Sequence, residues 1–302
     1  MRSALLSAAD NRSLQRFMYR HGMNLGARRF VAGETLDEFL TVVRAVNDRG
    51  FTVAAGLLGE GVEAERDAAS VVHEYQHILR RLSSLSLRSN IALKLTHLGL
   101  AIQKKLALDN LRTIAAEAAQ LGNFVRIDME QSAYTDATLA IYRNLRGEGR
   151  VNVGTVLQAY LRRSEADLQA LLPLQPNLRL VKGAYLESPD IAFPKKADVD
   201  NNFVSLIETS LIGSGFTAIA THDQVIIERS IEFIKQHGIP DDRFEFQMLY
   251  GVGPRLQERL RDRGYRVRLA VPFGSQWYPY LMRRLAERPA NLVFFLGTLW
   301  RR

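Results

Sequence analysis

The chain has 302 residues, of which 47% are hydrophobic and 24% charged, as in a globular protein with a substantial core. It contains no cysteine, which excludes disulfides, cysteine-ligated metal centres and cysteine nucleophiles. The net charge of +8 arises from 40 basic and 32 acidic residues scattered along the sequence, a pattern that predicts no nucleic-acid partner.

The first 45 residues are predicted to form one or two helices in front of the main domain. Residues 1–33 are rich in arginine and contain a single acid, Asp10, a composition also found in transit peptides. An apolar helical stripe favours a packed helix instead, and it comprises Leu14, Phe17, Met18 and Met23. Membrane association through this segment or another surface stays open, although no run approaches the ~20 apolar residues of a spanning helix.

From residue 46 onward, short apolar runs alternate with longer amphipathic stretches. The predicted strands are 51–58, 91–95, 124–129, 152–158, 178–182, 217–221, 244–249 and 267–272. The predicted helices are 63–82, 103–121, 135–145, 164–172, 199–214, 224–236 and 254–263, and an eighth follows the last strand. Eight strand–helix units in about 250 residues predict an α/β fold, a closed (β/α)8 barrel over 46–302 with its eighth helix over the mouth.

A doubly wound open sheet is the alternative fold. It is disfavoured because no GxGxxG motif follows the first strand, and because Gly251 and Gly253 follow only the seventh. No proline- or glycine-rich linker divides the chain, so a single domain is predicted overall.

Active sites of such barrels lie at the carboxyl ends of the strands. The polar side chains predicted there are Glu60, Lys94, Asp128, Glu130, Gln158, Arg179, Lys182, Tyr185, His222, Asp223, Glu245 and Gln247. Lys94 interrupts an apolar strand, which is costly unless it points into the mouth beside an anion such as Asp128. Three interpretations of Lys182 are open: a Schiff-base lysine, a fixed cation that binds an anionic cofactor, or one partner of an ion pair.

Histidines give no metal site. His222 is a candidate acid, base or hydrogen-bond donor, and no second histidine lies nearby at metal-ligand spacing. His73 and His77 spell HExxH, but on a predicted crossover helix outside the barrel, so we interpret the motif as a surface coincidence.

The eighth helix carries two adjacent arginines. One helix face holds four side chains spaced three or four residues apart, namely Tyr280, Arg283, Arg284 and Glu287. Two guanidiniums beside an aromatic ring suit a carboxylate or phosphate, whereas a solvated charged face is the alternative. The site thus offers cations, amides and aromatic rings without an obvious nucleophile, which favours a bound cofactor as the source of reactivity.

In order along the chain, these segments resemble the motifs of the proline dehydrogenase family, flavin-dependent enzymes that oxidise L-proline to Δ1-pyrroline-5-carboxylate. The matching motifs are LLGE (57–60), LKL (93–95), IDME (127–130), LQAY (157–160), RLVKGAY (179–185), ATH (220–222) and YLMRRLAE (280–287). The resemblance covers nearly the whole barrel, and the chain is similar to the monofunctional bacterial type.

For the substrate, the resemblance implies that Arg283, Arg284 and Lys94 bind the proline carboxylate and aim C5 of the ring at N5 of the flavin. Asp128 would orient Lys94 and the flavin edge. Other implied roles are ring walls from Leu180, Tyr185 and Leu249, support of the arginines from Glu287, and a gate formed by Glu60 with Arg284.

For the cofactor, FAD, the implied contacts are Gln158, Arg179, Lys182, Gly183, Ala184, Thr221 and His222. Arg179 and Lys182 would be cations near the isoalloxazine or the phosphates, whereas Gln158 and His222 would form hydrogen bonds. The family passes its electrons to a membrane quinone. The resemblance therefore implies a cytoplasmic protein with peripheral contact to the inner face of the cell membrane.

One position departs from the family pattern. Before the segment Val271-Pro272-Phe273-Gly274 the family usually has a tyrosine that packs against the substrate, and here the residue is Ala270. The open volume predicts weaker proline binding and a relaxed bias against 4-hydroxyproline.

Two other functions fit parts of this sequence. A lyase or aldolase of the same fold would use Lys182 as a Schiff base and purify colourless. A basic nucleic-acid-binding protein is disfavoured because no basic cluster with interleaved aromatic residues is present.

Overall fold

The computed structural model describes residues 16, 18–20, 22–23, 26–59 and 61–287, the last five of these by their backbone alone. Eight strands close into one barrel in sequence order, each parallel to its neighbours, with the first strand pairing to the last. They are β1 (Thr52–Leu57), β2 (Ser89–Leu93), β3 (Val125–Ile127), β4 (Val153–Gln158), β5 (Asn177–Val181), β6 (Phe216–Ala220), β7 (Phe244–Leu249) and β8 (Val267–Phe273). The predicted (β/α)8 barrel is confirmed, and the doubly wound sheet is wrong.

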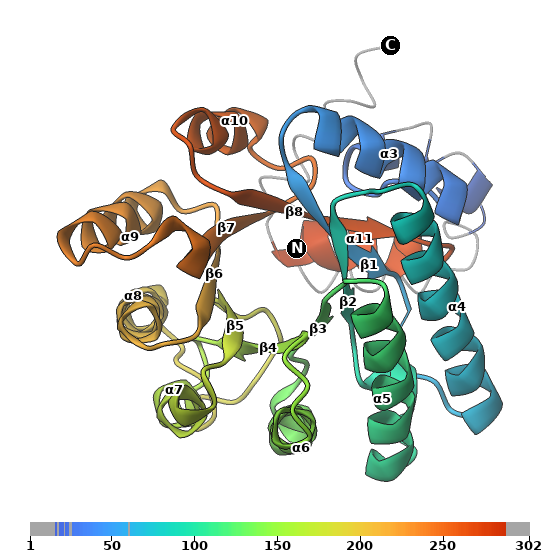
Figure 1. Ribbon diagram of the computed structural model, residues 1–302, viewed down its shortest axis with the longest axis horizontal. Helices are drawn as coiled ribbons and strands as arrows, with labels where there is room; N and C mark the ends of the chain where they lie inside the picture. The colour runs from blue at the N-terminus through green and yellow to red at the C-terminus, as the bar shows by residue number, and fades with distance from the viewer. Residues whose placement is uncertain (1–15, 17, 21, 24–25, 60, 288–302) are drawn as a thin grey trace.

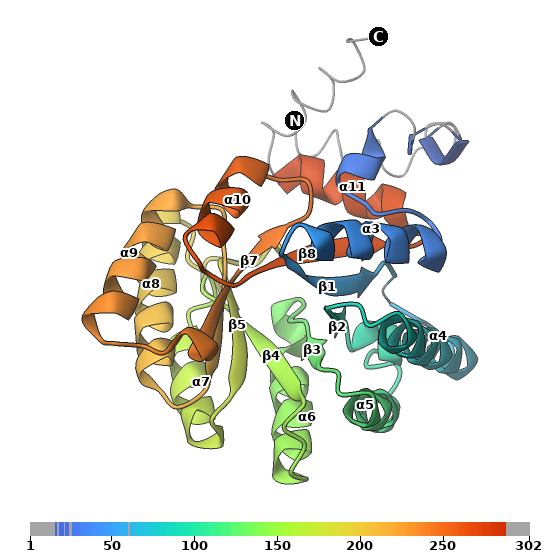
Figure 2. The ribbon, with the colours of Figure 1, turned by 45° about the horizontal axis from the view of Figure 1, so that its top comes forward.

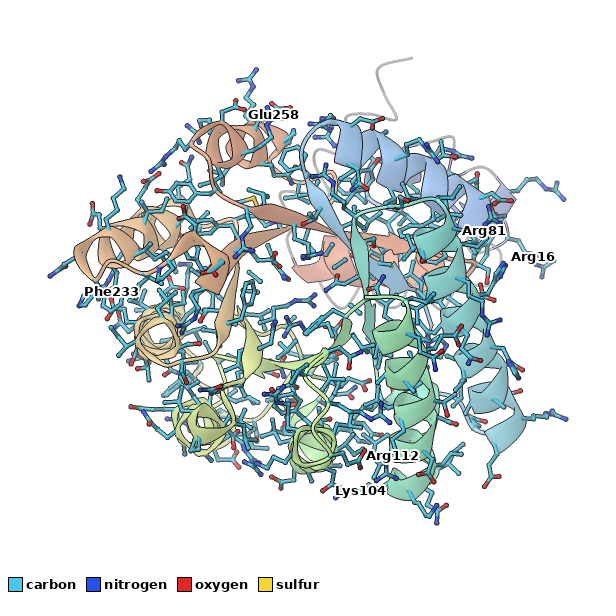
Figure 3. The ribbon with its side chains drawn as sticks, in the orientation of Figure 1. Arg16, Arg81, Lys104, Arg112, Phe233 and Glu258 are labelled. Carbon is cyan, nitrogen blue, oxygen red and sulfur yellow. The ribbon has the colours of Figure 1, made fainter. Side chains whose placement is uncertain are left out.

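Helices surround this ring of strands (Figure 1). They are α3 (Leu36–Asp48), α4 (Glu65–Ser84), α5 (Lys104–Gln120), α6 (Thr135–Gly147), α7 (Ser164–Leu171), α8 (Lys196–Ile212), α9 (Gln224–Gln236), α10 (Pro254–Asp262) and α11 (Trp277–Glu287). Short 3-10 turns are η1 (Ala27–Arg29), η2 (Thr96–Leu98), η3 (Ser132–Tyr134), η4 (Leu172–Leu174) and η5 (Asp241–Arg243). Charged side chains on the outer elements, such as Arg81, Lys104, Arg112 and Glu258, point away from the barrel (Figure 3).

Helix α11 differs in placement from the helices before it. Figures 1 and 2 show α4 to α10 flanking the ring, while α11 crosses behind it, at the end where β8 finishes. This position agrees with the predicted eighth helix over the mouth.

Several strand boundaries differ from the predicted ones, because polar residues lie within a strand or directly after its end. β2 begins at Ser89 because Ser89 and Asn90 are buried and pair with β1. β2 and β3 also end earlier than predicted, so that Lys94 and Asp128 lie just beyond their strands. Side chains immediately past a parallel strand meet at one edge of the sheet, which places both residues at the mouth.

The main core lies between the barrel and its helices, and α3 belongs to it. Phe39 of α3 stacks on Phe273 of β8, with ring centroids 4.1 Å apart. Thr35 begins the helix with a capping box, since its hydroxyl accepts from the Glu38 N–H while the Glu38 carboxylate accepts from the Thr35 N–H. Helix α3 therefore attaches the second half of the N-terminal segment to the barrel.

A smaller apolar cluster joins the N-terminal segment to α11. It is formed by Met18, Ala27, Val31, Trp277, Tyr278, Leu281 and Met282, with Met23, Phe30, Leu58 and Tyr280 packed against it. Two members of the predicted N-terminal stripe, Met18 and Met23, are therefore packed as expected. The other two, Leu14 and Phe17, lie outside the described residues. No helix in the described part of the chain has the length and apolarity to span a membrane.

Candidate functional site

The inward face of the barrel carries charged side chains where such barrels usually pack branched apolar ones. Arg126 of β3, Arg179 of β5 and Glu245 of β7 are buried, and Arg268 of β8 is half-buried. Burial lowers the pKa of Arg126 to about 9, with a further contribution from the like charge of Arg179. Sequence reasoning missed Arg126 and Arg268, although each interrupts an apolar strand, the signal that identified Lys94.

Arg179 is the centre of this network. Its Nε donates to Gln247 Oε1 at 2.6 Å, and its Nη1 donates to Asp128 Oδ1 at 2.6 Å. The third nitrogen, Nη2, is buried and has no hydrogen-bond partner among the described residues. A buried guanidinium nitrogen without a partner is costly, so this N–H is suited to a ligand group.

Small residues lie next to these charged ones in the barrel ladder. Ala92 and Gly154 pair with Arg126, and Ala218 pairs with both Arg179 and Glu245. Residues paired in a parallel ladder point to the same side, so these positions line the interior with little volume. At Gly154 a Cβ would lie 2.4 Å from Arg126 Nη1 and 2.5 Å from the Asn177 carbonyl oxygen, which belongs to the backbone, so the close packing here favours glycine.

The structure brings Lys94 and Asp128 to adjacent positions. Leu93 pairs with Ile127 at the end of the β2–β3 ladder, and the Asp128 N–H donates to the Leu93 carbonyl at 2.8 Å. Both side chains are half-buried. The structure thus brings their backbones together, and the orienting role of Asp128 toward Lys94 stays a prediction.

Gln158 lies at the end of β4 and is buried. Its Nε2 donates to the backbone carbonyl of Glu130 at 2.9 Å. The Glu130 carboxylate accepts from the N–H and hydroxyl of Thr96, at 3.1 and 2.6 Å. Glu130 therefore anchors the turn after β2 and holds the loop that Gln158 contacts.

His222 and Thr221 follow β6. The Leu249 N–H donates to His222 Nε2 at 3.0 Å, which fixes the imidazole against the end of β7. Because Nε2 accepts, a neutral ring carries its proton on Nδ1 and is a donor there. The hydroxyl of Thr221 accepts from the Asp223 N–H at 3.1 Å.

Lys182 forms an ion pair with two carboxylates. Its Nζ lies 2.5 Å from Asp200 Oδ1 on α8 and 2.9 Å from Asp223 Oδ2 at the start of α9. Of the three interpretations of Lys182, the ion pair is present, and an amine engaged with two carboxylates is not free to attack a carbonyl. Sequence reasoning missed Asp200, which lies 18 residues away on the helix that follows.

The predicted ring walls are placed as follows. Leu249 and Ala270 pair on β7 and β8, so the structure brings them together, and Ala270 also pairs with Ala54 of β1. Leu180 is fully buried in the main core, and half-buried Tyr185 packs against a cluster containing Tyr160 and Leu161. Their contact with substrate stays a prediction.

Two predicted cofactor contacts lie between β5 and Tyr185. Gly183 has φ +105°, a conformation that favours glycine, and a Cβ there would lie 2.1 Å from the Tyr160 ring. Ala184 is exposed.

The arginine clamp is described by its backbone alone. Arg283, Arg284 and Glu287 belong to α11, and their side chains, like all of Glu60, lie outside the described residues. The first part of α11 is firmly placed, because Trp277 Nε1 donates to Glu34 Oε1 at 2.5 Å and the Trp277 ring is fully buried.

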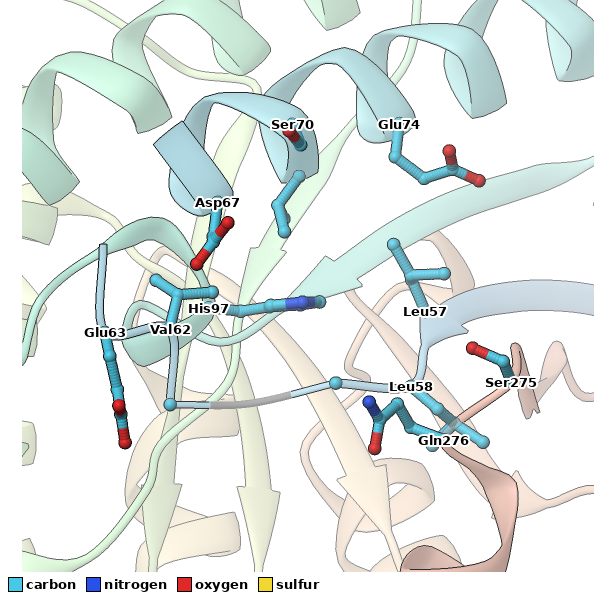
Figure 4. A pocket seen from close by; sticks show the side chains of 13 residues that line it. Leu57, Leu58, Val62, Glu63, Asp67, Ser70, Glu74, His97, Ser275 and Gln276 are labelled. Atoms are coloured by element: carbon cyan, nitrogen blue, oxygen red, sulfur yellow. The ribbon is translucent and has the colours of Figure 1, made fainter. Parts of the chain in front are cut away.

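A cavity of about 490 Å³ lies beside the loop after β1 (Figure 4). Its lining includes Leu57, His97, Ser275 and three acids, Glu63, Asp67 and Glu74, and among the described residues no lysine or arginine lines it. The described part of this wall is therefore acidic, in contrast to the cationic inward face around Arg179.

Comparisons with known proteins show the family of the chain. The chain matches the family model described as proline dehydrogenase over residues 39–295. It is 43% identical over 296 residues to proline dehydrogenase 1 of Bacillus subtilis (strain 168), with 98% of each chain covered. It is 39% identical over 297 residues to the proline dehydrogenase of Deinococcus radiodurans, covering 97% of this chain and 96% of that relative.

Solved structures show the same barrel. Proline utilization A from Bdellovibrio bacteriovorus, inactivated by N-propargylglycine, matches with a TM-score of 0.83 at 24% identity, over 98% of this chain and 39% of that one. At this identity the likeness shows the fold alone. The family match and the two relatives together show more: the chain belongs to the proline dehydrogenase family, the enzymes that oxidise proline in the first step of its catabolism.

Proposed function

We propose that this chain uses FAD to oxidise L-proline to Δ1-pyrroline-5-carboxylate and passes the electrons to a quinone. The observation that supports it most is Arg179, a buried cation at the inward face whose Nη2 has no partner among the described residues. When bound, FAD would supply a hydride acceptor, its N5, for the hydrogen at C5 of proline.

The residues of the inward face fit a flavin. The ring system is planar and polar at its edge, so it needs width and hydrogen-bond donors. Three small residues, Ala92, Ala218 and Ala220, leave space beside the side chains with which they pair in the ladder, Arg126, Arg179 and Gln247. Two groups can donate hydrogen bonds to the ring edge: Arg179 Nη2 and, in the neutral tautomer, His222 Nδ1.

The remaining cofactor contacts are proposed from the same rim. Gln158 and Thr221 would form hydrogen bonds, and the backbone of Gly183 and Ala184 would approach the cofactor closely. Lys182 would act as a cation there, although Asp200 and Asp223 already bind its amine, so its charge is shared with them.

Substrate binding is proposed to rest on three cations. Lys94, Arg283 and Arg284 would bind the carboxylate, and charge-assisted bonds would fix the ring so that C5 is presented to the acceptor. The reaction needs the substrate nitrogen unprotonated. Asp128, held by Arg179, would orient Lys94, and Glu287 would support the arginine pair one turn further along.

The ring would be enclosed by Tyr185 and Leu249, with Ala270 leaving volume beside C4. Leu180 follows inward-facing Arg179 on β5 and belongs to the core between the barrel and its helices, so it would support this wall from outside the barrel. The pairing of Ala270 with Leu249 supports its place in this wall. Glu60 would pair with Arg284 as a gate after proline has entered.

The electron acceptor and location follow from the family resemblance. A membrane quinone requires approach to a lipid surface, so we propose a cytoplasmic protein with peripheral contact to the inner face of the cell membrane.

Product formation tests the proposal. Incubation with L-proline and a soluble quinone should form Δ1-pyrroline-5-carboxylate, trapped as its coloured o-aminobenzaldehyde adduct, in equal amount to the quinone reduced. Formation of the product without reduction of the quinone would contradict the proposal that a quinone is the electron acceptor. A protein labelled at Lys182 by borohydride and substrate would instead support the aldolase.

A further inference from the structure

Gln247 has its amide orientation fixed by its two neighbours. Arg179 can only donate and the carboxylate of Glu245 can only accept. The Gln247 amide must therefore present Oε1 to Arg179 Nε, at 2.6 Å, and Nε2 to Glu245 Oε1, at 2.5 Å. Both side chains of β7 are buried, at 4% exposure each.

Glu245 is itself held by Arg268. Arg268 Nε lies 2.7 Å from Glu245 Oε1, its Nη2 lies 3.1 Å from Oε2, and its Nη1 donates to the Val53 carbonyl at 2.9 Å. Burial raises the pKa of Glu245, but the charge and hydrogen bonds of Arg268 lower it by a larger amount. The net pKa of Glu245 is therefore below its usual value. The acceptor that orients Gln247 is thus an ionised, fixed carboxylate.

The resulting chain of contacts crosses the barrel from Val53 on β1 through Arg268, Glu245 and Gln247 to Arg179 on β5. Removal of the Gln247 oxygen leaves Arg179 Nε without an acceptor. Arg179 already donates from Nη1 to Asp128, and guanidinium–carboxylate pairs favour two parallel bonds. Arg179 would turn toward Asp128 and withdraw Nη2 from its present position.

We propose that Gln247 is a positioning residue for the flavin cofactor: oriented by Glu245, it holds Arg179 so that Nη2 is presented to the bound ring. The inference rests on the proposed function, because it needs Arg179 to contact the flavin. Gln247 acts through Arg179 and not by direct contact with the cofactor.

The test is a double-mutant cycle on the dissociation constant of FAD, measured by titrating FAD into the full-length protein stripped of flavin. Gln247→Met keeps the side-chain length, and both neighbouring charges keep their ion pairs, Glu245 with Arg268 and Arg179 with Asp128. We expect it to raise the Kd for FAD by about ten-fold, as for a lost bond to a charged group. In Arg179→Lys, which has no Nε–H, the same substitution should change Kd by less than about two-fold.

Two further variants separate positioning from general damage. Asn152→Leu removes a half-buried amide from the opposite end of the barrel, where Asn152 donates to the Ala115 carbonyl at 2.9 Å, and should leave the Kd unchanged. Gln247→Asn, a milder change, should still weaken FAD binding because the shorter amide cannot reach both neighbours.

Equal effects of Gln247→Met with and without Arg179, or an unchanged Kd in both Gln247 variants, would overturn the inference. A wild-type protein that binds no FAD would instead overturn the proposed function, so the two failures are distinguishable.

Discussion

The residues that line this barrel are of two kinds: small ones that leave space for ligands, and charged ones that orient neighbouring side chains. Ala270 and Ala218 lie in register with Leu249 and Arg179, respectively, so each small side chain adjoins a proposed site residue. The consequences of changing either kind are measurable.

Arg284→Ala should weaken proline binding, because the substrate carboxylate loses a charged partner. We expect a loss of about 2–4 kcal/mol, measured as the KM for L-proline and the Ki of a carboxylate inhibitor. The FAD content should stay near that of the wild type. An unchanged KM would mean that the arginine pair does not face the substrate.

Ala270→Tyr should fill the volume beside C4 of the ring. The expected result is a lower KM for L-proline and a larger ratio of kcat/KM for proline over 4-hydroxyproline. Ala270→Val, which fills less of the space, should fall between. The idea fails if the ratio is the same in all three proteins.

At the scale of elements, the placement of α11 depends on the segment ahead of the barrel. The Ala32 N–H donates to the Pro272 carbonyl and the Gly274 N–H to the Gly33 carbonyl, both at 2.9 Å. With the bond between Trp277 and Glu34, these contacts fix the turn that leads from β8 into the arginine helix.

Trp277→Phe should loosen the start of α11, since the buried ring keeps its apolar contacts but loses the N–H. We expect a loss of about 1 kcal/mol, seen as a drop of roughly 2 °C in Tm, together with a higher KM for proline. Glu34→Gln retains an acceptor oxygen and should stay near the wild type. A KM equal to that of the wild type in Trp277→Phe would contradict the anchoring role.

Element boundaries were predictable where periodicity is strong and local. The bounds 224–236 of α9 match the structure because its apolar face repeats cleanly between two polar ends. The start of β2 was not predictable, since buried Ser89 and Asn90 look polar in the sequence. Their burial depends on pairing with β1, a contact made only in the closed barrel.

For the whole molecule, segments 1–45 and 46–302 are proposed to act as a single domain. Helix α3 spans this boundary and packs Phe39, Leu40 and Val43 into the main core. The pairing of Arg268 with Glu245, or of Lys182 with Asp200, follows from tertiary closure, so sequence spacing alone could not have found it. The presence of charges within apolar strands was visible, but their partners were not.

The free energy of unfolding should fall at acid pH, because the ion pairs of Lys182 with Asp200 and Asp223 are lost there. Burial raises the pKa of Asp200 and of Asp223, and the hydrogen bond and charge of Lys182 lower it more, so both pKa values are depressed. A depressed carboxyl pKa contributes stability that is present above the unfolded pKa of about 4 and is lost as pH falls through the folded value.

The check is Tm measured between about pH 7 and pH 3 for the flavin-free protein. The wild type should hold its Tm down to about pH 5 and then lose it steeply. Lys182→Met removes the shared partner and should show a smaller acid-side loss. Parallel curves for the two proteins would contradict the pairing.

The central claim, a flavin site that oxidises proline, is tested most directly by the visible spectrum of the purified protein. We predict flavin absorption bands that bleach when L-proline is added without oxygen and return when a quinone is supplied. A colourless protein, or flavin bands that L-proline leaves unchanged, would contradict the account.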